Sequence, residues 1–155
     1  MRTIEYISVI VFAGVLASIT VCHPKFLGEN KFLLEYVNHE YINSLIVIVT
    51  VSFVSVTQIH LEYSRIERRF KTQVFSKARR EVNAGAAILI TLLFLSLPLV
   101  IVKSEYITNT FVQSTAHSLA LLALVVSFLI MYDFIKTVYV LAAEEPVEGD
   151  DNNAA

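Results

Sequence analysis

Hydrophobic residues fall in four long blocks along the chain and do not alternate with polar residues as they would in a half-buried strand. Each block is about 20 residues long or longer, which is the length that a helix needs to cross the hydrocarbon core of a bilayer. A helix also pairs its backbone amides internally, as lipid requires. The pattern therefore predicts an all-α integral membrane protein, a bundle of four transmembrane helices at about residues 4–22, 41–61, 84–102 and 117–141.

The composition favours lipid as the surroundings of these blocks. Of the 155 residues, 55% are hydrophobic and only 17% are charged, and the mean hydropathy is +0.63. A soluble domain of this size leaves much of its surface in water and does not hide so much apolar surface. The single cysteine, Cys22, also excludes a disulfide framework or a thiolate zinc site.

The first block has one feature of a cleavable signal peptide, because the basic residue Arg2 precedes it. The block also contains Glu5, is long for the apolar region of a signal, and is not followed by an A-x-A-like cleavage site. We therefore expect it to be retained as the first transmembrane helix.

Positive charge is concentrated between the second and third blocks. Cytoplasmic loops of membrane proteins carry the excess of Lys and Arg, so this segment is expected to lie in the cytoplasm beside the anionic lipids of the inner leaflet. Both termini then also lie in the cytoplasm, and the chain is a multi-pass protein of the inner (plasma) membrane. Seven of the 12 Lys and Arg residues belong to the segment: Arg65, Arg68, Arg69, Lys71, Lys77, Arg79 and Arg80.

The basic segment, residues 62–83, is predicted to be a helical hairpin that extends the second and third helices into the cytoplasm. No glycine or proline occurs between Gly28 and Gly85, so nothing ends the second helix at the membrane surface. Residues 142–155 are predicted to be a disordered acidic tail. The hairpin and the tail carry opposite charge, so we expect them to attract each other.

Two loops are expected on the outer side of the membrane. The loop at 24–40 contains an amphipathic stretch from Lys31 to Val37, and the loop at 104–115 is rich in Ser and Thr. His23, His39 and His117 are expected to be isolated histidines near this outer face, because they lack the spacing of a metal-ligand pair.

The second block carries a line of polar residues, which makes it the main candidate site. Asn43, Thr50, Thr57 and Ser64 follow one another at intervals of seven, so they share one face of a helix, with Gln58 on the neighbouring strip. Two accounts fit this face. Its side chains hydrogen-bond across helix contacts or back to their own carbonyls, or copies of the helix surround an axis and line a narrow path for ions.

Asp133 is an ionisable residue inside the fourth block, and such residues in membrane segments are candidates for function. It lies near the inner end of its helix, with Lys136 about one turn further on. An interfacial ion pair that fixes helix packing is the plainer interpretation, and a proton-coupled or ion-binding role is the alternative.

The sequence contains no G-x-S-x-G, H-E-x-x-H or C-x-x-C motif and no Gly-rich phosphate-binding loop. We therefore predict no enzymatic activity, no cofactor, no metal and no nucleic-acid partner. The function predicted first is an oligomeric, non-enzymatic membrane assembly that conducts ions or permeabilises the membrane through the polar face of the second span. The alternatives are a membrane anchor or scaffold that recruits a cytosolic protein through the basic hairpin, and a small proton-coupled transporter that uses Asp133.

The plan of a basic hairpin between the second and third of four spans resembles that of the membrane component of phage-exclusion systems. The resemblance covers topology alone, so no residue is carried over from that family.

Overall fold

The computed structural model describes residues 3–71, 74–102 and 109–143, and in these ranges the chain is helical, with no strand. The prediction of an all-α protein is therefore confirmed. Residues 103–108, which include the start of the loop predicted at 104–115, lie outside the described residues. So do residues 144–155 of the tail predicted at 142–155, whereas Ala142 and Ala143 belong to the last helix. The helices are α1 (Thr3–Cys22), α2 (Pro24–Gly28), α3 (Lys31–Tyr36), α4 (His39–Phe70), α5 (Ser76–Val102) and α6 (Thr110–Ala143).

Three of these helices, α4, α5 and α6, are long and apolar enough to cross a membrane. The first block forms α1, but its described apolar part, Tyr6–Cys22, is shorter than the other three segments. The presence of membrane-spanning candidates agrees with the sequence prediction, whereas the count of four spans stays a prediction.

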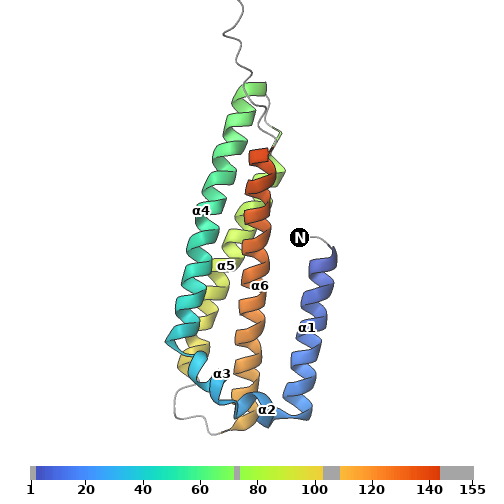
Figure 1. The fold of residues 1–155 in the computed structure, drawn as a ribbon, viewed down its shortest axis with the longest axis vertical. Coiled ribbons are helices and arrows are strands. Elements are labelled where there is room, and N and C mark those ends of the chain that lie inside the picture. Colours follow the sequence, from blue (N-terminus) through green and yellow to red (C-terminus); the bar gives the residue numbers. More distant parts are fainter. Residues whose placement is uncertain (1–2, 72–73, 103–108, 144–155) are drawn as a thin grey trace, which may run out of the picture.

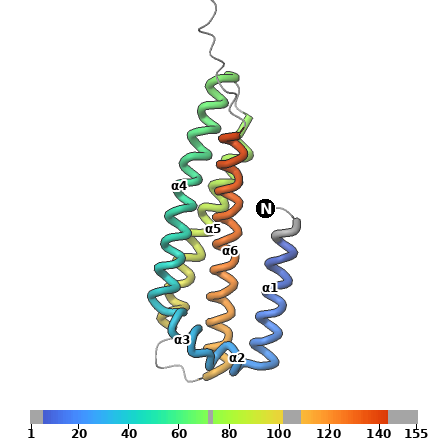
Figure 2. Tube along the Cα trace, viewed as in Figure 1, coloured from blue at the N-terminus to red at the C-terminus, as the bar shows by residue number. Residues whose placement is uncertain are grey.

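Helices α4, α5 and α6 form an elongated bundle (Figure 1). In this bundle α4 and α6 run in the same direction, and α5 is antiparallel to both. Helix α1 lies on the far side of α6, contacts α6 and α2, and diverges from the bundle toward its own N-terminus (Figure 2). The short helices α2 and α3 cross the end of the bundle where α1 stops and α6 starts.

Helix α4 continues as a single helix from its apolar segment to Phe70, where the next residue, Lys71, takes the left-handed conformation with φ 51°. The absence of glycine and proline in this stretch explains its continuity, because no residue there breaks the helical ladder. Helix α5 starts at Ser76, so α4 and α5 make the expected antiparallel hairpin. From Leu61 to Lys71 the hairpin extends by about 15 Å, at 1.5 Å per residue.

Residues 110–115, expected as part of the loop at 104–115, instead belong to the first two turns of α6. Asn109 explains the early start, because its side-chain oxygen accepts a hydrogen bond from the amide of Phe111 at 2.9 Å. An asparagine in this position satisfies an amide that the first helical turn leaves without a partner. The run of Thr and Ser that indicated a loop is therefore compatible with a capped helix start.

The bundle is packed around two groups of buried residues, one toward the hairpin and one toward α2 and α3. Ile59, Leu89 and Phe134 belong to the first group, and Tyr41 and Leu45 belong to the second. Helices in lipid have no hydrophobic drive to associate, so in a membrane close packing would have to hold these three together. Gly85 provides such packing, because a Cβ atom at this position would lie only 2.8 Å from Cζ of Phe134.

Candidate functional site

The polar line of the second block lies on the side of α4 that faces away from the bundle. Asn43, Thr50 and Thr57 are exposed, as is Gln58, and Ser64 is half-buried. The residues that α4 buries lie on the opposite side of the helix: Tyr41, Leu45, Ile48, Ser52, Ser55, Val56, Ile59 and Tyr63. Within one protomer, the exposed members of the line are therefore not part of the contacts between helices.

The hydroxyl groups of this line bond to their own helix. Thr50 Oγ1 donates to the carbonyl of Ile46 at 2.8 Å, and Thr57 Oγ1 donates to the carbonyl of Phe53 at 2.9 Å. Threonine commonly makes this bond to the carbonyl four residues earlier, which satisfies the hydroxyl within an apolar environment. The oxygen of each hydroxyl can still accept a hydrogen bond from another molecule.

Apolar residues alternate with this polar line and complete a continuous strip. Val47, Val54 and Leu61 each follow a member of the line by four residues, and their exposed fractions are 61%, 57% and 60%. Successive steps of four and three residues make the heptad spacing by which two helices pack side by side. We call this strip the α4 seam: Asn43, Val47, Thr50, Val54, Thr57 and Leu61.

The two amides near the seam differ from its hydroxyl groups. Within the described part of the chain, the exposed side chains of Asn43 and Gln58 make no hydrogen bond. A threonine satisfies itself on its own helix, whereas an amide carries two donors and an acceptor that need outside partners. The two residues are 15 positions apart, about 22 Å along the helix, so they lie toward opposite ends of the apolar part of α4.

Buried serines lie on the inner side of α4 and on the helices that face it. Tyr41 and Ser96 join α4 to α5 through a hydrogen bond of 3.0 Å between their hydroxyl oxygens. The hydroxyl oxygens of Ser52 in α4 and Ser127 in α6 are buried without a hydrogen-bond partner among the described residues. These small residues allow α4 and α6 to approach closely.

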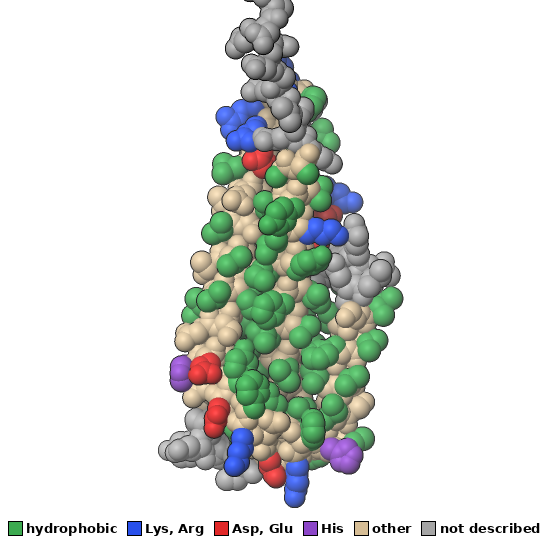
Figure 3. Space-filling model, in the orientation of Figure 1, with side chains coloured by type: hydrophobic (Ala, Val, Ile, Leu, Met, Phe, Trp, Pro, Cys, Tyr) green, Lys and Arg blue, Asp and Glu red, His purple; other side chains and the backbone are tan. Residues whose placement is uncertain are grey.

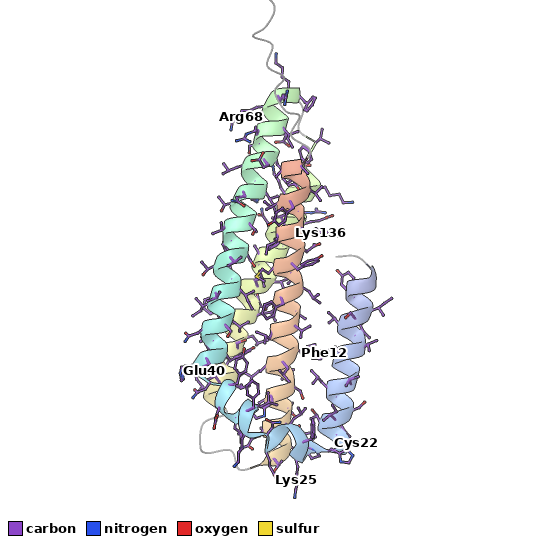
Figure 4. The ribbon with its side chains drawn as sticks, viewed as in Figure 1. Phe12, Cys22, Lys25, Glu40, Arg68 and Lys136 are labelled. Atoms are coloured by element: carbon purple, nitrogen blue, oxygen red, sulfur yellow. The ribbon has the colours of Figure 1, made fainter. Side chains whose placement is uncertain are left out.

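The end of the bundle next to the hairpin holds the ionisable residues of the fourth block. Asp133 and Lys136 are both half-buried on α6, and the Asp133 carbonyl accepts a hydrogen bond from Thr137 at 2.8 Å. Along the length of the bundle, Lys136 lies at about the height of the N-terminal end of α1 (Figure 4). On the neighbouring helices, His60 and Asn83 are joined by a hydrogen bond of 2.8 Å. This level of the bundle is therefore polar, whereas the middle of the visible face is free of charged side chains (Figure 3).

Two of the seven basic residues of the hairpin have carboxylate partners on α4. The Arg79 guanidinium lies 2.8 Å from the Glu67 carboxylate, and Arg65 lies 3.3 Å from Glu62. Glu67 also accepts a hydrogen bond from the amide of Phe75 at 3.1 Å, so this one carboxylate holds the start of α5 against α4. Sequence reasoning treated the seven cations as one group and missed that Arg79 stabilises the hairpin itself.

Five other cations of the hairpin are exposed, and none of them forms an ion pair within the described residues. Two exposed apolar side chains, Phe70 and Val74, lie between them in the sequence. Arg68 lies near the end of α4, beyond the level of Lys136 (Figure 4). We call this surface the hairpin tip: Arg68, Arg69, Phe70, Lys71, Val74, Lys77 and Arg80.

His117 corrects one expectation, because it is fully buried and is not an interfacial residue. Its Nδ1 lies 2.6 Å from the carbonyl oxygen of Leu27, and since a carbonyl only accepts, Nδ1 carries the proton. The next residue, Ser118, forms a hydrogen bond of 2.6 Å with Thr20 of α1. The same turn of α6 therefore contacts both α1 and α2. The signal in the sequence was the small residues that flank His117, which leave room for α2.

Two apolar grooves run along the outer half of α6. One lies between α5 and α6 with a volume of about 410 Å³, and the other lies between α1 and α6 with a volume of about 330 Å³. Phe111, Thr115 and Leu119 border both grooves. The second groove reflects the limited contact of α1, which joins the bundle through α6 and α2.

Comparison of the chain with protein-family models, curated proteins and solved structures found no significant match. The function therefore has to be argued from the residues of this chain.

Proposed function

We propose that the protein is a non-enzymatic, oligomeric membrane assembly in which the α4 seams of several protomers meet around an axis and line a narrow path for ions. The observation that carries this proposal is the position of the polar line, which is on the outside of the protomer. In a lone protomer within a bilayer this line faces lipid tails. In an assembly it faces other copies and the space between them.

The chemistry of the seam favours contact with a second copy over contact with lipid. Thr50, about 17 Å along α4 from His39, lies near the middle of a hydrocarbon core about 30 Å thick. Hydroxyl groups and small or β-branched side chains at heptad spacing allow helices to pack closely in membranes. Asn43 at one end of the seam offers an amide that pairs with its counterpart in another copy and fixes the register, as single polar residues do in coiled coils.

A ring of α4 helices gives the path alternating polar and apolar levels. All copies of the chain have the same topology, so rotational symmetry about the membrane normal makes their α4 helices parallel. Thr50 and Thr57 then present hydroxyl oxygens that replace part of the hydration shell of an ion, and Val47 and Val54 form apolar constrictions between them. No residue in the seam is charged, so the path does not select strongly by charge.

In this assembly all four long helices cross the inner membrane, with both termini and the hairpin in the cytoplasm. Two observations support this arrangement. Tyr132 and Tyr139 are exposed near the inner end of α6, where aromatic residues anchor a helix at the membrane surface. The hairpin carries seven of the 12 basic residues, as a cytoplasmic loop does.

The test is ion flux into liposomes that contain the purified protein. Replacing Thr50 and Thr57 together with valine removes the two hydroxyl levels at almost unchanged volume, and we expect flux to fall at least tenfold while the assembly size is unchanged. Thr91→Val is the matched control, because Thr91 of α5 is also exposed and its hydroxyl bonds the Ala87 carbonyl at 2.8 Å. Equal flux in the wild type and in the double variant would exclude the lining role of α4.

The hairpin tip supports a second candidate function, a membrane scaffold that recruits a cytosolic protein of acidic surface. The supporting observation is that Glu67 fixes the hairpin, so the exposed cations are held in place before any partner binds. Charge reversal at Arg68, Arg69 and Arg80 is expected to release such a partner and leave ion flux unchanged. Arg79 is kept, since its removal would open the hairpin.

A further inference from the structure

We propose that the hairpin tip is the binding surface for the acidic C-terminal segment of the same chain, residues 144–151. The inference does not depend on the ion path, because it concerns only the hairpin and the end of α6. It rests on three properties: the charge and apolar content of the two partners, the height of the tip above the membrane, and the place where α6 ends.

The tip and the C-terminal segment are complementary in composition. The tip combines five exposed cations with Phe70 and Val74, whose side chains are 67% and 70% exposed. The segment from 144 to 151 reads EEPVEGDD, five carboxylates around a proline and a valine. A cationic surface that also exposes apolar side chains fits an acidic peptide with an apolar residue in its middle, because both the charges and the apolar side chains then find partners.

The height of the tip disfavours the lipid headgroups of the protein's own membrane as its ligand. Lys71 lies ten residues beyond Leu61, the last residue of the seam, which corresponds to about 15 Å along the helix. The headgroup layer of one leaflet is only about 5–8 Å thick. The end of the hairpin at Lys71 therefore stands beyond that layer by a distance similar to the Debye length of about 8 Å, so screening weakens its attraction to the headgroups.

The end of α6 places the acidic segment within reach of the tip. Leu141 of α6 and Phe75, the residue before α5, pack against the same group of buried residues. The described part of α6 ends at Ala143, near the start of α5 (Figure 1), and each residue after it spans up to about 3.5 Å. A ligand on so short a connection has an effective concentration in the millimolar range, which compensates for weak individual ion pairs.

Occupation of the tip by the C-terminal segment has a consequence for other acidic partners. Any cytosolic protein or polyanion that binds the tip must first displace the segment. The tip is therefore free to bind such a partner in only a fraction of the molecules. Removal of residues 144–155 is therefore expected to raise the affinity of the tip for an acidic peptide in solution.

Disulfide cross-linking in the full chain tests the proposal. In a Cys22→Ser background, Val74→Cys and Val147→Cys place one thiol on the tip and one in the acidic segment, and cysteine keeps the apolar character of both positions. The protein is placed in nanodiscs of zwitterionic lipid and oxidised mildly. The matched control has the same two cysteines but carries Gln or Asn at all five acidic positions, so its connection to α6 has the same length.

We expect the acidic segment to cross-link within one chain about tenfold faster than the neutral control, and the difference to disappear in 1 M salt. Equal rates in the two proteins would mean that proximity alone brings the thiols together, and would overturn the proposal. Disulfide cross-links between two chains would also overturn it, because they would show that the acidic segment binds the hairpin tip of another copy. Loss of the cross-link when anionic lipid replaces zwitterionic lipid would also overturn it, because headgroups would then be the stronger ligand.

Discussion

His117 of α6 and Leu27 of α2 are joined by a buried hydrogen bond of 2.6 Å, from the imidazole Nδ1 to the carbonyl oxygen. Since α2 is only five residues long, this bond and the packing of its backbone on α6 hold it in place. Through α2 the same contact helps to set the position of α1, which otherwise contacts the bundle mainly on α6.

Replacing His117 by phenylalanine keeps a ring of similar size and removes the donor, so the Leu27 carbonyl loses its side-chain partner. We expect the free energy of unfolding to fall by about 1–3 kcal/mol, the cost of a buried polar group without its hydrogen bond. Titration with SDS from a mild detergent measures the loss. His39→Phe is the control, because His39 is exposed, and an equal loss in both variants would argue against the role of His117.

Replacing each of two glycines with alanine is predicted to change the stability of the protein in opposite directions. A Cβ atom on Gly28 would lie 2.6 Å from the carbonyl oxygen of Thr110, whereas nothing lies within 4 Å of a Cβ atom on Gly14. Gly28→Ala is expected to destabilise the protein by about 1–3 kcal/mol, because backbone has to move. Gly14→Ala is expected to stabilise α1 by up to about 1 kcal/mol. The same unfolding titration separates the two, and stability unchanged by Gly28→Ala would contradict the close contact of α2 with α6.

The Glu67–Arg79 pair is predicted to control the opening of the hairpin. Glu67→Gln keeps the size of the side chain and weakens the charge-assisted bond, at a cost of about 1–2 kcal/mol. Amide hydrogen exchange in residues 60–71 and 74–82 should then become about fivefold to thirtyfold faster. Glu62→Gln is the control, since the exposed Arg65–Glu62 pair contributes less than about 0.5 kcal/mol. Similar exchange rates in both variants would contradict the role of Glu67 in holding the hairpin closed.

The sequence predicts the helical class and the three long helices because their apolar blocks have the length of a membrane and contain few breakers. It predicts that α4 continues beyond its apolar block for a similar reason, since no glycine or proline lies between Gly28 and Gly85. It does not predict which face of a membrane helix points inward. Apolar residues surround such a helix on all sides, because lipid and protein interior favour the same side chains.

The polar line of α4 illustrates this limit. Its spacing identifies a face, but only the packing of Ile48 and Ile59 in the bundle shows that Thr50 points outward. The burial of His117 was not predicted either, since it depends on α2 folding back onto α6, a contact between residues 90 positions apart. The position of α1 likewise follows from contacts that periodicity does not contain.

The central claim is that copies of the protein meet along the α4 seam, and cysteine cross-linking in native membranes tests it most directly. In a Cys22→Ser background, Val47→Cys places a thiol on the seam, and Leu95→Cys places one on α5 with nearly the same exposure, 61% against 62%. Both positions lie about 10–12 Å from the outer ends of their helices, so they have the same depth in the membrane. The account predicts a covalent dimer from Val47→Cys and none from Leu95→Cys, whereas equal yields or monomer alone from both variants would contradict it.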